Sequence, residues 1–409
     1  MRVRGNAIFP ASIAGRFSIL FAILRQLALV LSTAIFSSEL KTLDPDVFFV
    51  DQLSACVPLL RLLCPKARVL FYGHFPDRLL AKEGSGISKV VKGFYRRPFD
   101  AVESWSTGCA DSIVVNSKFT RSVFRQTFAS TKNRELKVVY PCVDTQAKSP
   151  PDDPAPWPDK RVLLSINRYE GKKNLALAIR AFAGLSSDER EKAKLVIAGG
   201  YDPRVHENVN TLKFLQEQAT SLDLTHSTIK GAGTAALASD TNSILFLLSV
   251  PDTLKTRLLT TARLLIYTPQ NEHFGIVPLE AMLARVPVLA TNTGGPLETI
   301  YDGRTGWLRS PEKVEQWTAV LRKPLIPSSE DSLKLMGERG RERVLAEFSH
   351  TKMTKALEEE MARMCGDAGK RPSLVPQWAG AFVATGLVAV VGVVLGIWGW
   401  HFLLGRWRA

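Results

Sequence analysis

The sequence predicts an α/β protein with two doubly wound, parallel-sheet domains followed by a transmembrane helix. Three observations support this prediction. Short β-branched and aliphatic runs alternate with helical stretches along most of the 409 residues, which is typical of parallel sheets covered by helices on both faces. A proline-rich stretch, residues 149–160, interrupts this alternation. A long apolar segment without charged residues lies near the C-terminus.

Composition and charge narrow the range of functions. Hydrophobic residues make up 45% of the chain and charged residues 22%, which excludes a fibrous or wholly disordered protein. The net charge of +14 favours an anionic membrane surface or a bound diphosphate as partner. Nucleic acid is not expected, because no basic cluster with aromatic residues and no known binding module is recognised. The five cysteines lack metal-ligand spacing and predict free thiols in a reducing compartment, with the folded domains facing the cytosol.

The predicted N-terminal domain covers residues 1–148 and begins with an unusual apolar segment, residues 17–36. Arg25 and Gln26 lie in the middle of this segment, and a central arginine is costly in a spanning helix. We therefore predict an interfacial helix or a membrane-dipping hairpin, with Arg16 and Arg25 near lipid headgroups. The alternative is an ordinary helix of a soluble domain.

Nine apolar runs predict the strands of two sheets. Four belong to the N-terminal domain and five to a C-terminal domain of residues 161–348. Five prolines exclude a regular element from residues 149–160, which are predicted as a linker. Because doubly wound sheets bind ligands at the carboxyl ends of their strands, we expect the two domains to face a cleft there. The predicted strands are Val47–Val50, Val69–His74, Ser112–Asn116, Lys137–Tyr140, Val162–Ile166, Lys194–Ala198, Ile244–Leu248, Leu264–Tyr267 and Val288–Thr291.

A helical and linker segment, residues 349–376, leads to the predicted transmembrane helix, residues 377–404. The stretch from Trp378 to Leu404 contains no Asp, Glu, Lys or Arg, and about 20 apolar residues suffice to span a bilayer. Tryptophans near its ends suit the two membrane interfaces. Basic residues lie on both sides, so charge leaves the orientation open.

Two glutamates mark the first candidate site, in the sequence YTPQNEHFGIVPLEAM of residues 267–282. Glu272 is predicted on a loop at the carboxyl end of a strand, and Glu280 near the start of the next helix. A carboxylate there can accept hydrogen bonds from two sugar or ribose hydroxyls at once. Backbone N–H groups of this loop, which includes Phe274 and Gly275, favour a phosphate.

A basic loop forms the second candidate site, in SINRYEGKKN, residues 165–174. Arg168 and Lys173 lie on a turn that directly follows a predicted strand. Two cations on one loop suit a diphosphate, whose negative charge rises as a nucleotide leaves. The alternative is a charged turn that is only solvated.

Glycines follow two of the predicted strands. Gly294 and Gly295 lie between a strand and a helix in TNTGGPLETI, and glycine lets the backbone approach a ligand closely. Gly199 and Gly200 are a similar but weaker case. A tight strand–helix turn without any ligand is the alternative for each pair.

The N-terminal domain contributes the sequence HFPD, residues 74–77, where a strand meets a proline-containing loop. His74, Phe75 and Asp77 are candidates for binding an acceptor, together with Asn116 in the run VVNSKFT. A lone histidine is more often a structural hydrogen-bonding residue than a catalyst, so that alternative stays open for His74.

Several of these motifs resemble one known family. The spacing Glu-x7-Glu from Glu272 to Glu280, with His-Phe-Gly after the first Glu, resembles the signature of family 4 retaining glycosyltransferases, which have the GT-B fold. FYGHFPD, VVNSKFT, LLSINRYEGKKN and VIAGGYDPRV resemble a subgroup of mannosyltransferases that act on dolichol-linked oligosaccharides. The resemblance runs from about Arg2 to Phe348 and implies two Rossmann-like domains.

The resemblance also implies roles for residues. Glu272 is expected to bind the donor hexose, Glu280 the nucleotide ribose, and Arg168 and Lys173 the donor diphosphate. His74 is expected near the donor sugar. No candidate protein nucleophile is recognised, and the resemblance implies front-face attack with the donor phosphate as base. The residues assigned to donor binding are Arg168, Lys173, Gly199, Glu272, Phe274, Gly275, Glu280, Gly294 and Gly295, and those on the acceptor side are His74, Phe75, Asp77 and Asn116.

The function implied by the resemblance is the transfer of mannose from GDP-mannose to Man1GlcNAc2-diphosphodolichol. Two successive additions, alpha-1,3 and alpha-1,6, are expected with retention, as steps of N-glycan precursor synthesis. Close relatives need no metal, and no cofactor is expected here. The expected location is the endoplasmic reticulum membrane, with the catalytic domains facing the cytosol. Other early mannosyltransferases of the pathway are further expected partners.

The sequence also departs from the family pattern. Members begin with a strand and a Gly-Gly-containing loop, whereas this sequence begins at RVRGNAIFP, so the first βα unit of the N-terminal domain is expected to be missing. Two alternatives therefore stay open. One is an inactive membrane-anchored remnant or scaffold, and the other is a related lipid-linked sugar transferase with a different acceptor.

Overall fold

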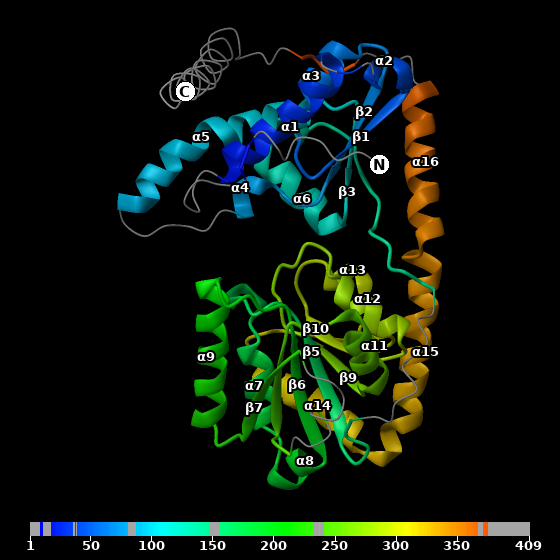
Figure 1. The fold of residues 1–409 in the computed structure, drawn as a ribbon. Coiled ribbons are helices and arrows are strands. Elements are labelled where there is room, and N and C mark those ends of the chain that lie inside the picture. Colours follow the sequence, from blue (N-terminus) through cyan, green and yellow to red (C-terminus); the bar gives the residue numbers. More distant parts are fainter. Residues whose placement is uncertain are drawn as a thin grey trace. The chain divides into compact units, whose positions relative to one another are not determined.

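The computed structural model describes residues 9–10, 18–35, 37, 39–80, 87–146, 156–231, 237, 241–366 and 371–374. These residues form two compact units (Figure 1). The first unit comprises residues 1–115, 121–138 and 358–409, and the second comprises residues 116–120 and 139–357. The chain therefore enters the second unit briefly at residues 116–120 and returns to the first unit after residue 357.

The first unit is built on a parallel sheet of four strands in the order β1-β2-β3-β4. Its core contains Val69, Phe71, Ile113 and Val115 from the central strands, all nearly inaccessible to solvent. Continuous apolar strands of this kind need cover on both faces, which helices provide. The elements are α1 (Ser18–Ile35), α2 (Glu39–Leu43), β1 (Val47–Asp51), α3 (Val57–Leu63), β2 (Arg68–Gly73), α4 (Asp77–Leu80), α5 (Ile87–Gly108), β3 (Ser112–Val115), α6 (Lys118–Thr127), η1 (Ala129–Thr131) and β4 (Leu136–Val138).

Helix α1 corresponds to the unusual N-terminal apolar segment. Gln26 donates to Leu53 O at 2.5 Å and accepts from Cys56 N at 3.1 Å, and Val30 is buried in the core of the first unit. The polar residue in the middle of the helix thus bonds to two backbone groups of the segment before α3, and the membrane contact of this helix stays a prediction. Among the described residues, no helix is both long enough and apolar enough to cross a membrane. The predicted transmembrane helix, residues 377–404, lies outside them.

The second unit is built on a seven-stranded parallel sheet with helices on both faces (Figure 1). The order is β11-β10-β9-β5-β6-β8-β7. Two buried clusters cover the opposite faces of this sheet, around Phe182 and Trp317 on one and Leu258 and Met282 on the other. The elements are β5 (Arg161–Ile166), η2 (Gly171–Lys173), α7 (Ala176–Ala183), α8 (Ser187–Glu191), β6 (Ala193–Gly199), α9 (His206–Ser221), β7 (His226–Lys230), β8 (Ile244–Leu248), α11 (Asp252–Thr261), β9 (Leu264–Tyr267), α12 (Ile276–Leu283), β10 (Val288–Thr291), α13 (Pro296–Thr299), β11 (Gly306–Arg309), α14 (Val314–Arg322), η3 (Lys323–Leu325), η4 (Pro327–Ser329), α15 (Glu330–Glu347) and α16 (His350–Gly366).

The strand order of the second unit identifies where a ligand should bind. From β5 the chain proceeds to one side of the sheet through β6, and it later returns to β9, which pairs with β5 on the other side. The order therefore reverses between β5 and β9. In open parallel sheets, such a switch point leaves a crevice at the carboxyl ends of the two strands, where ligands bind.

All nine predicted strands are confirmed, with ends that differ by at most two residues. Two further strands were not predicted, β7 and β11. Both lie at an edge of the seven-stranded sheet, and β7 has the polar sequence HSTIK with no buried residue. An edge strand is covered less completely than a central strand, so its sequence lacks the continuous apolar run by which the others were recognised.

The predicted linker, residues 149–160, is described only from residue 156. Trp157 is 5% exposed and belongs to the core of the second unit, where its Nε1 donates to Leu237 O at 2.8 Å. Val143 also joins this core, and its N–H donates to Phe348 O at 3.1 Å. The second unit thus begins before the proline-rich segment, at Val139.

Candidate active site

The loop after β5 carries the predicted diphosphate-binding cations. Arg168 is 63% exposed, and its Nη1 lies 2.8 Å from Glu170 Oε1, while Lys172 Nζ lies 3.3 Å from the other oxygen of Glu170. Tyr169 is fully buried between them, and its hydroxyl donates to Ile197 O at 2.8 Å. The buried tyrosine fixes the loop, so the exposed guanidinium of Arg168 is held at the carboxyl end of β5.

Lys173 and Glu272 meet at the switch point. Lys173 Nζ lies 2.5 Å from Glu272 Oε2, and the two side chains are 11% and 21% exposed. Thr268, the first residue after β9, donates through Oγ1 to Lys173 O at 2.7 Å and joins the two loops. The structure thus brings together two of the predicted site residues that are 99 positions apart in the sequence.

The charge state of Glu272 follows from this pairing. Burial raises the pKa of the Glu272 carboxyl, but the Coulombic attraction and hydrogen bond of Lys173 outweigh burial and lower that pKa below its usual value of 4.5. Burial, reinforced by Glu272, raises the pKa of the neighbouring Tyr267 hydroxyl. At neutral pH the Glu272 carboxylate is therefore ionised and the Tyr267 phenol beside it is neutral. An ionised carboxylate can accept hydrogen bonds from hydroxyl groups.

Glu280 is paired with a residue that sequence reasoning missed. Lys255 of α11 donates through Nζ to Glu280 Oε1 at 2.7 Å and lies 2.6 Å from Oε2, and each side chain is 28% exposed. Glu280 lies on α12, which begins after Gly275, a residue with φ of +90°. Lys255 lies on a different helix from Glu280 and is not part of any recognised motif. The sequence around it therefore gave no indication that it contacts Glu280.

The Gly-Gly loop lies directly against the Glu272 loop. An added Cβ at Gly294, where φ is +69°, would lie 2.6 Å from Glu272 O, and one at Gly295 would lie 2.2 Å from Phe274 O. Gly295 N donates to Glu272 O at 2.7 Å. These glycines therefore allow two loops to pack backbone to backbone, which positions Glu272. Their direct contact with a donor stays a prediction.

Phe274 and Gly199 also have packing roles. The Phe274 side chain is 3% exposed and stacks on Tyr140, with ring centroids 5.6 Å apart. An added Cβ at Gly199 would lie 1.9 Å from Asn167 O, so only glycine lets the end of β6 approach the loop after β5. Donor contacts of both residues stay predictions.

The first unit carries three of the predicted acceptor-side residues. His74 follows β2, and its Nε2 lies 2.8 Å from Asp51 Oδ1 at the end of β1, with side chains 44% and 56% exposed. The His74 ring packs edge-on against Tyr72, with centroids 5.1 Å apart. Phe75 is half-buried, and Asp77 N donates to Glu103 Oε1 at 2.7 Å. The exposed carboxyl ends of β1 and β2 thus hold an oriented imidazole, and Asp51 was not predicted.

Asn116 belongs to the second unit and is 4% exposed. Within the described part of the chain, its Oδ1 has no hydrogen-bond partner. The next residues are fixed by Glu298, which follows the Gly-Gly loop: its carboxylate accepts from the N–H groups of Lys118 and Phe119, both at 2.8 Å. Ser117 Oγ donates to His273 O at 2.6 Å. Sequence reasoning missed Glu298, although it lies inside the quoted glycine motif.

Metal ligands were also sought among the described residues. No group of three or more His, Cys, Asp or Glu side chains in the described ranges could hold a metal ion.

Two family models match the sequence. The family described as Glycosyl transferases group 1 matches residues 151–343, and the family described as Glycosyltransferase Family 4 matches residues 8–147. The alpha-1,3/1,6-mannosyltransferase alg-2 of Neurospora crassa is 50% identical, across 97% of this chain and 85% of its own length. The enzyme of the same name from Schizosaccharomyces pombe is 43% identical, across 95% and 74%. That of Saccharomyces cerevisiae is 41% identical, across 87% and 72%.

Solved structures show the same fold. A sucrose-phosphate synthase from Thermosynechococcus elongatus superimposes with a TM-score of 0.64 at 15% identity, covering 89% of this chain and 82% of its own. Anabaena Alr3699/HepE in complex with UDP-glucose superimposes with a TM-score of 0.57 at 16% identity, covering 79% and 80%. At such low identity these similarities establish the GT-B-like α/β architecture alone.

Proposed function

The chain belongs to the alpha-1,3/1,6-mannosyltransferases, and we propose that its donor is GDP-mannose and its acceptor Man1GlcNAc2-diphosphodolichol. One mannose is added in alpha-1,3 linkage and a second in alpha-1,6 linkage, each with retention. The relatives named above share 41–50% identity with this chain over most of its length, which supports mannosyl transfer as the reaction.

The observation that carries the donor proposal is the pairing of Lys173 with Glu272 at the switch point of the second unit. A nucleotide-sugar presents a diphosphate and several hydroxyl groups to such a crevice. Glu272 accepts hydrogen bonds from mannose hydroxyls, and Glu280 accepts from the ribose. Both carboxylates have a lysine partner, which keeps them oriented before the donor arrives.

Stabilisation of the leaving GDP is the largest contribution that this site makes to catalysis. As the glycosidic bond breaks, negative charge builds up on the diphosphate. Arg168 and Lys173 lie on one loop at the end of β5, and both are cations that can neutralise it. Removal of one such electrostatic contact from an active site typically costs about 3–4 kcal/mol in the transition state.

The acceptor is assigned to the first unit. The acceptor hydroxyl approaches past His74 in this proposal, which is supported by the contact that orients the His74 ring against Asp51 and by Phe75 and Asp77 on the same loop. No protein nucleophile is invoked. The acceptor oxygen attacks the face that the GDP leaves, and a donor phosphate oxygen receives its proton.

The proposed location is the endoplasmic reticulum membrane, with both units facing the cytosol and residues 377–404 as the membrane-spanning segment. All five cysteines are free, as expected in a reducing compartment. The net charge of +14 suits an anionic membrane surface. No metal or other cofactor is assigned a role, and other early mannosyltransferases are proposed as partners.

The decisive experiment supplies labelled GDP-mannose and Man1GlcNAc2-diphospholipid to membranes that contain the full chain. We expect Man2 and Man3 lipids, whose new residues are released by alpha-mannosidase. Glu272→Ala is expected to lower the rate at least a hundredfold, equivalent to about 3 kcal/mol of transition-state stabilisation.

A matched control removes a glutamate that lies outside the site. Glu217 is 64% exposed and, among the described residues, pairs with Lys213 alone on the surface of α9, so Glu217→Ala is expected to retain full activity. No mannosylated lipid from the folded wild-type chain would contradict the proposal and favour a scaffold. Transfer to a different lipid-linked sugar would retain the reaction and correct the acceptor.

A further inference from the structure

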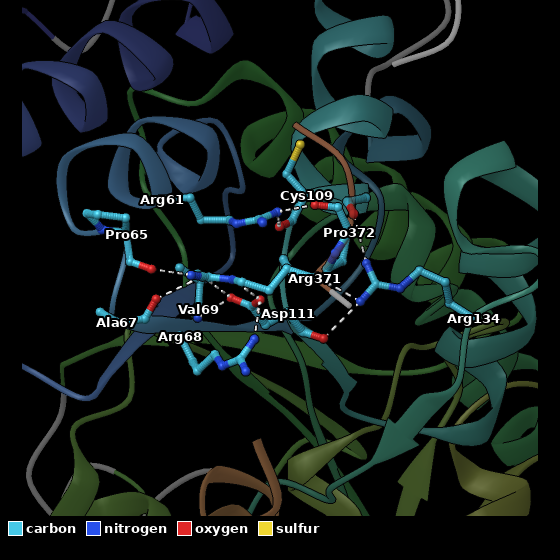
Figure 2. Close-up of polar contacts among 12 residues, drawn as sticks. Arg61, Pro65, Ala67, Arg68, Val69, Cys109, Asp111, Arg134, Arg371 and Pro372 are labelled. Carbon is cyan, nitrogen blue, oxygen red and sulfur yellow. Dashed lines mark hydrogen bonds and ion pairs between the residues drawn. The ribbon is translucent and has the colours of Figure 1, made fainter. Parts of the chain in front are cut away.

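Residues Arg371–Leu374 form a strap on the surface of the first unit. The strap bonds to residues of that unit that lie more than 250 positions earlier in the sequence. Arg371 donates to Asp111 through two nitrogens, Nε to Oδ1 and Nη2 to Oδ2, both at 2.8 Å (Figure 2). It also donates to Pro65 O at 2.5 Å and to Ala67 O at 2.8 Å. One side chain of the strap thus bridges two segments of the first unit.

Side chains of the first unit bind the strap in return. Each of its last three carbonyl groups accepts a hydrogen bond from a different side chain. Arg61 Nη1 donates to Pro372 O at 2.8 Å, Cys109 Sγ to Ser373 O at 3.9 Å, and Trp105 Nε1 to Leu374 O at 3.0 Å. Leu374 packs against the core of this unit. A segment without secondary structure is therefore held by specific contacts along its length.

The Arg371–Asp111 pair is stronger than an ordinary surface ion pair. The Asp111 side chain is 6% exposed and that of Arg371 is 22% exposed, so water and salt screen the pair little. Two parallel N–H bonds to one carboxylate also give the strongest geometry for this pairing. Burial raises the pKa of the Asp111 carboxyl, but the bonds from Arg371 and from Val69 N–H outweigh it and lower that pKa.

The strap can leave without stranding a buried charge. If Arg371 is removed, Asp111 still accepts from Val69 N at 2.8 Å and still has Arg68 Nη1 at 3.5 Å. Arg134 continues to cap the carbonyls of Gly108, Ala110 and Asp111 (Figure 2). Without the strap, Asp111 therefore keeps partners of its own and Arg61 keeps its bond to Cys109 O at 2.8 Å, which is the property of a latch and not of a core strand.

The strap lies close in sequence to the C-terminal apolar stretch. Leu374 precedes Trp378, the start of the apolar stretch, by four residues, which can extend no further than about 14 Å. Helix α3, which supplies Arg61 to the strap, exposes Leu62 at 66% and Leu63 at 41%. The described strap that precedes the apolar stretch thus contacts a helix that exposes two leucines.

We propose that Arg371–Leu374 is a latch that fixes the root of the C-terminal apolar segment to the first unit, so that a lipid bilayer holding this segment also holds that unit. The acceptor-side unit is then the part tied to the membrane in which a lipid-linked acceptor resides. This use of the latch rests on the proposed function, whereas the latch itself does not.

The latch is tested by the reactivity of cysteines in the full chain, in phosphatidylcholine vesicles, with N-ethylmaleimide as probe. Cys109 is 1% exposed and touches the strap, and burial raises its pKa to about 11. Cys56 is 4% exposed in the core of the same unit, with its pKa raised by burial to about 12, but it makes no contact with the strap within the described residues. Arg371→Ala is expected to accelerate alkylation of Cys109 at least tenfold and to leave Cys56 unchanged.

Two outcomes would overturn the latch. Cys109 could stay as protected in Arg371→Ala as in the wild type, or Cys56 could become reactive together with it, which would make the strap part of the core. Arg363→Ala is the matched control, because Arg363 lies on α16, pairs with Glu360 and is 52% exposed. It is expected to leave Cys109 protected, and Cys365, which is exposed, reports equal reagent in each sample.

The membrane role is tested by transfer to two acceptors. Arg371→Ala is expected to lose at least fivefold in rate with a long-chain lipid acceptor in the vesicles and to keep the wild-type rate with a short-chain, water-soluble acceptor. Equal effects on both acceptors would overturn the membrane role. If the wild type transfers mannose to neither acceptor, the proposed function fails, while the cysteine measurement still decides the latch.

Discussion

At the scale of residues, the site depends on pairs of charges that only the fold brings together. The motifs predicted Glu272, Glu280, Arg168 and Lys173 as single positions, because each lies in a recognisable loop at the end of a strand. They could not predict that Lys173 pairs with Glu272, or that Lys255 pairs with Glu280, since these contacts join separate segments. Partners supplied by another element leave no periodic or spaced pattern in the sequence.

The Glu272–Lys173 pair predicts a dependence of stability on pH. The folded state lowers the pKa of Glu272 below 4.5, so ionised Glu272 stabilises the fold above that pH, and this stabilisation disappears as the pH falls through the lowered value. Glu272→Gln cannot titrate. We therefore expect the melting temperature of the wild type to exceed that of Glu272→Gln by a constant amount between about pH 6 and 8, and the difference to shrink below pH 4.5. Thermal unfolding at a series of pH values measures it, and a difference independent of pH would show that the carboxylate is not stabilised by its lysine.

Lys255 is expected to position Glu280 for the nucleotide. Lys255→Met keeps much of the side-chain volume and removes the cation, so the partly exposed Glu280 loses an interaction of up to about 1 kcal/mol. The dissociation constant of GDP should rise about fivefold in calorimetric titrations. Lys213→Met is the control, because Lys213 is 76% exposed and lies 3.7 Å from Glu217 on the surface of α9, away from Glu280 in the sequence. Unchanged GDP affinity in Lys255→Met would separate Glu280 from nucleotide binding.

At the scale of elements, buried strands were predictable and edge strands were not. The central strands β5, β6 and β9 are continuous apolar runs, since helices cover both their faces. The edge strand β11 has only four residues, GWLR, and follows a turn at Gly303, where φ is +74°. It pairs in parallel with β10 along all four residues, so it is identified by its neighbour and not by an apolar run of its own.

The loop between β10 and α13 makes a steric prediction. Gly295 has a helical backbone, φ −57° and ψ −36°, so alanine would suffer no dihedral strain there. Its Cβ would nevertheless lie 2.2 Å from Phe274 O and 2.4 Å from Phe274 Cα, and backbone cannot yield as a flexible side chain can. Gly295→Ala should lower the free energy of unfolding by about 1–3 kcal/mol in urea titrations. Gly366→Ala, with nothing within 4 Å of the added atom, should differ little from the wild type, and equal values for both variants would contradict the close loop packing.

At the scale of the whole molecule, each of the two units is built from segments that are not consecutive in the sequence. The composition indicated two consecutive domains, because the proline-rich segment is the one clear interruption of the strand–helix alternation. The described residues after Leu357 nevertheless group with the first unit, where Glu360 accepts from Ser112 Oγ at 2.5 Å and lies 3.4 Å from Lys137 Nζ. A single buried glutamate on a polar helix gives no sequence signal of where that helix packs.

The boundary of the second unit leads to a prediction about fragments. Residues 161–348 follow the domain predicted from sequence, whereas residues 139–357 follow the structure. Only the longer fragment retains Tyr140, which packs against Phe274 and Phe348, and Trp157, which is 5% exposed in the core. Loss of one buried aromatic side chain typically costs about 3–5 kcal/mol.

Because both core clusters of the second unit lie within residues 139–357, we expect this fragment to unfold cooperatively and to bind GDP. The 161–348 fragment should be at least about 3 kcal/mol less stable in urea titrations followed by circular dichroism. Both fragments lack residues 116–120, whose N–H groups donate to Glu298, but only the longer fragment keeps the Tyr140 hydroxyl that donates to Glu298 Oε2 at 3.1 Å, and this adds to its advantage. Equal stability of the two fragments would mean that the segment before residue 161 does not stabilise the second unit. The domain boundary would then lie at residue 161, as predicted from the sequence.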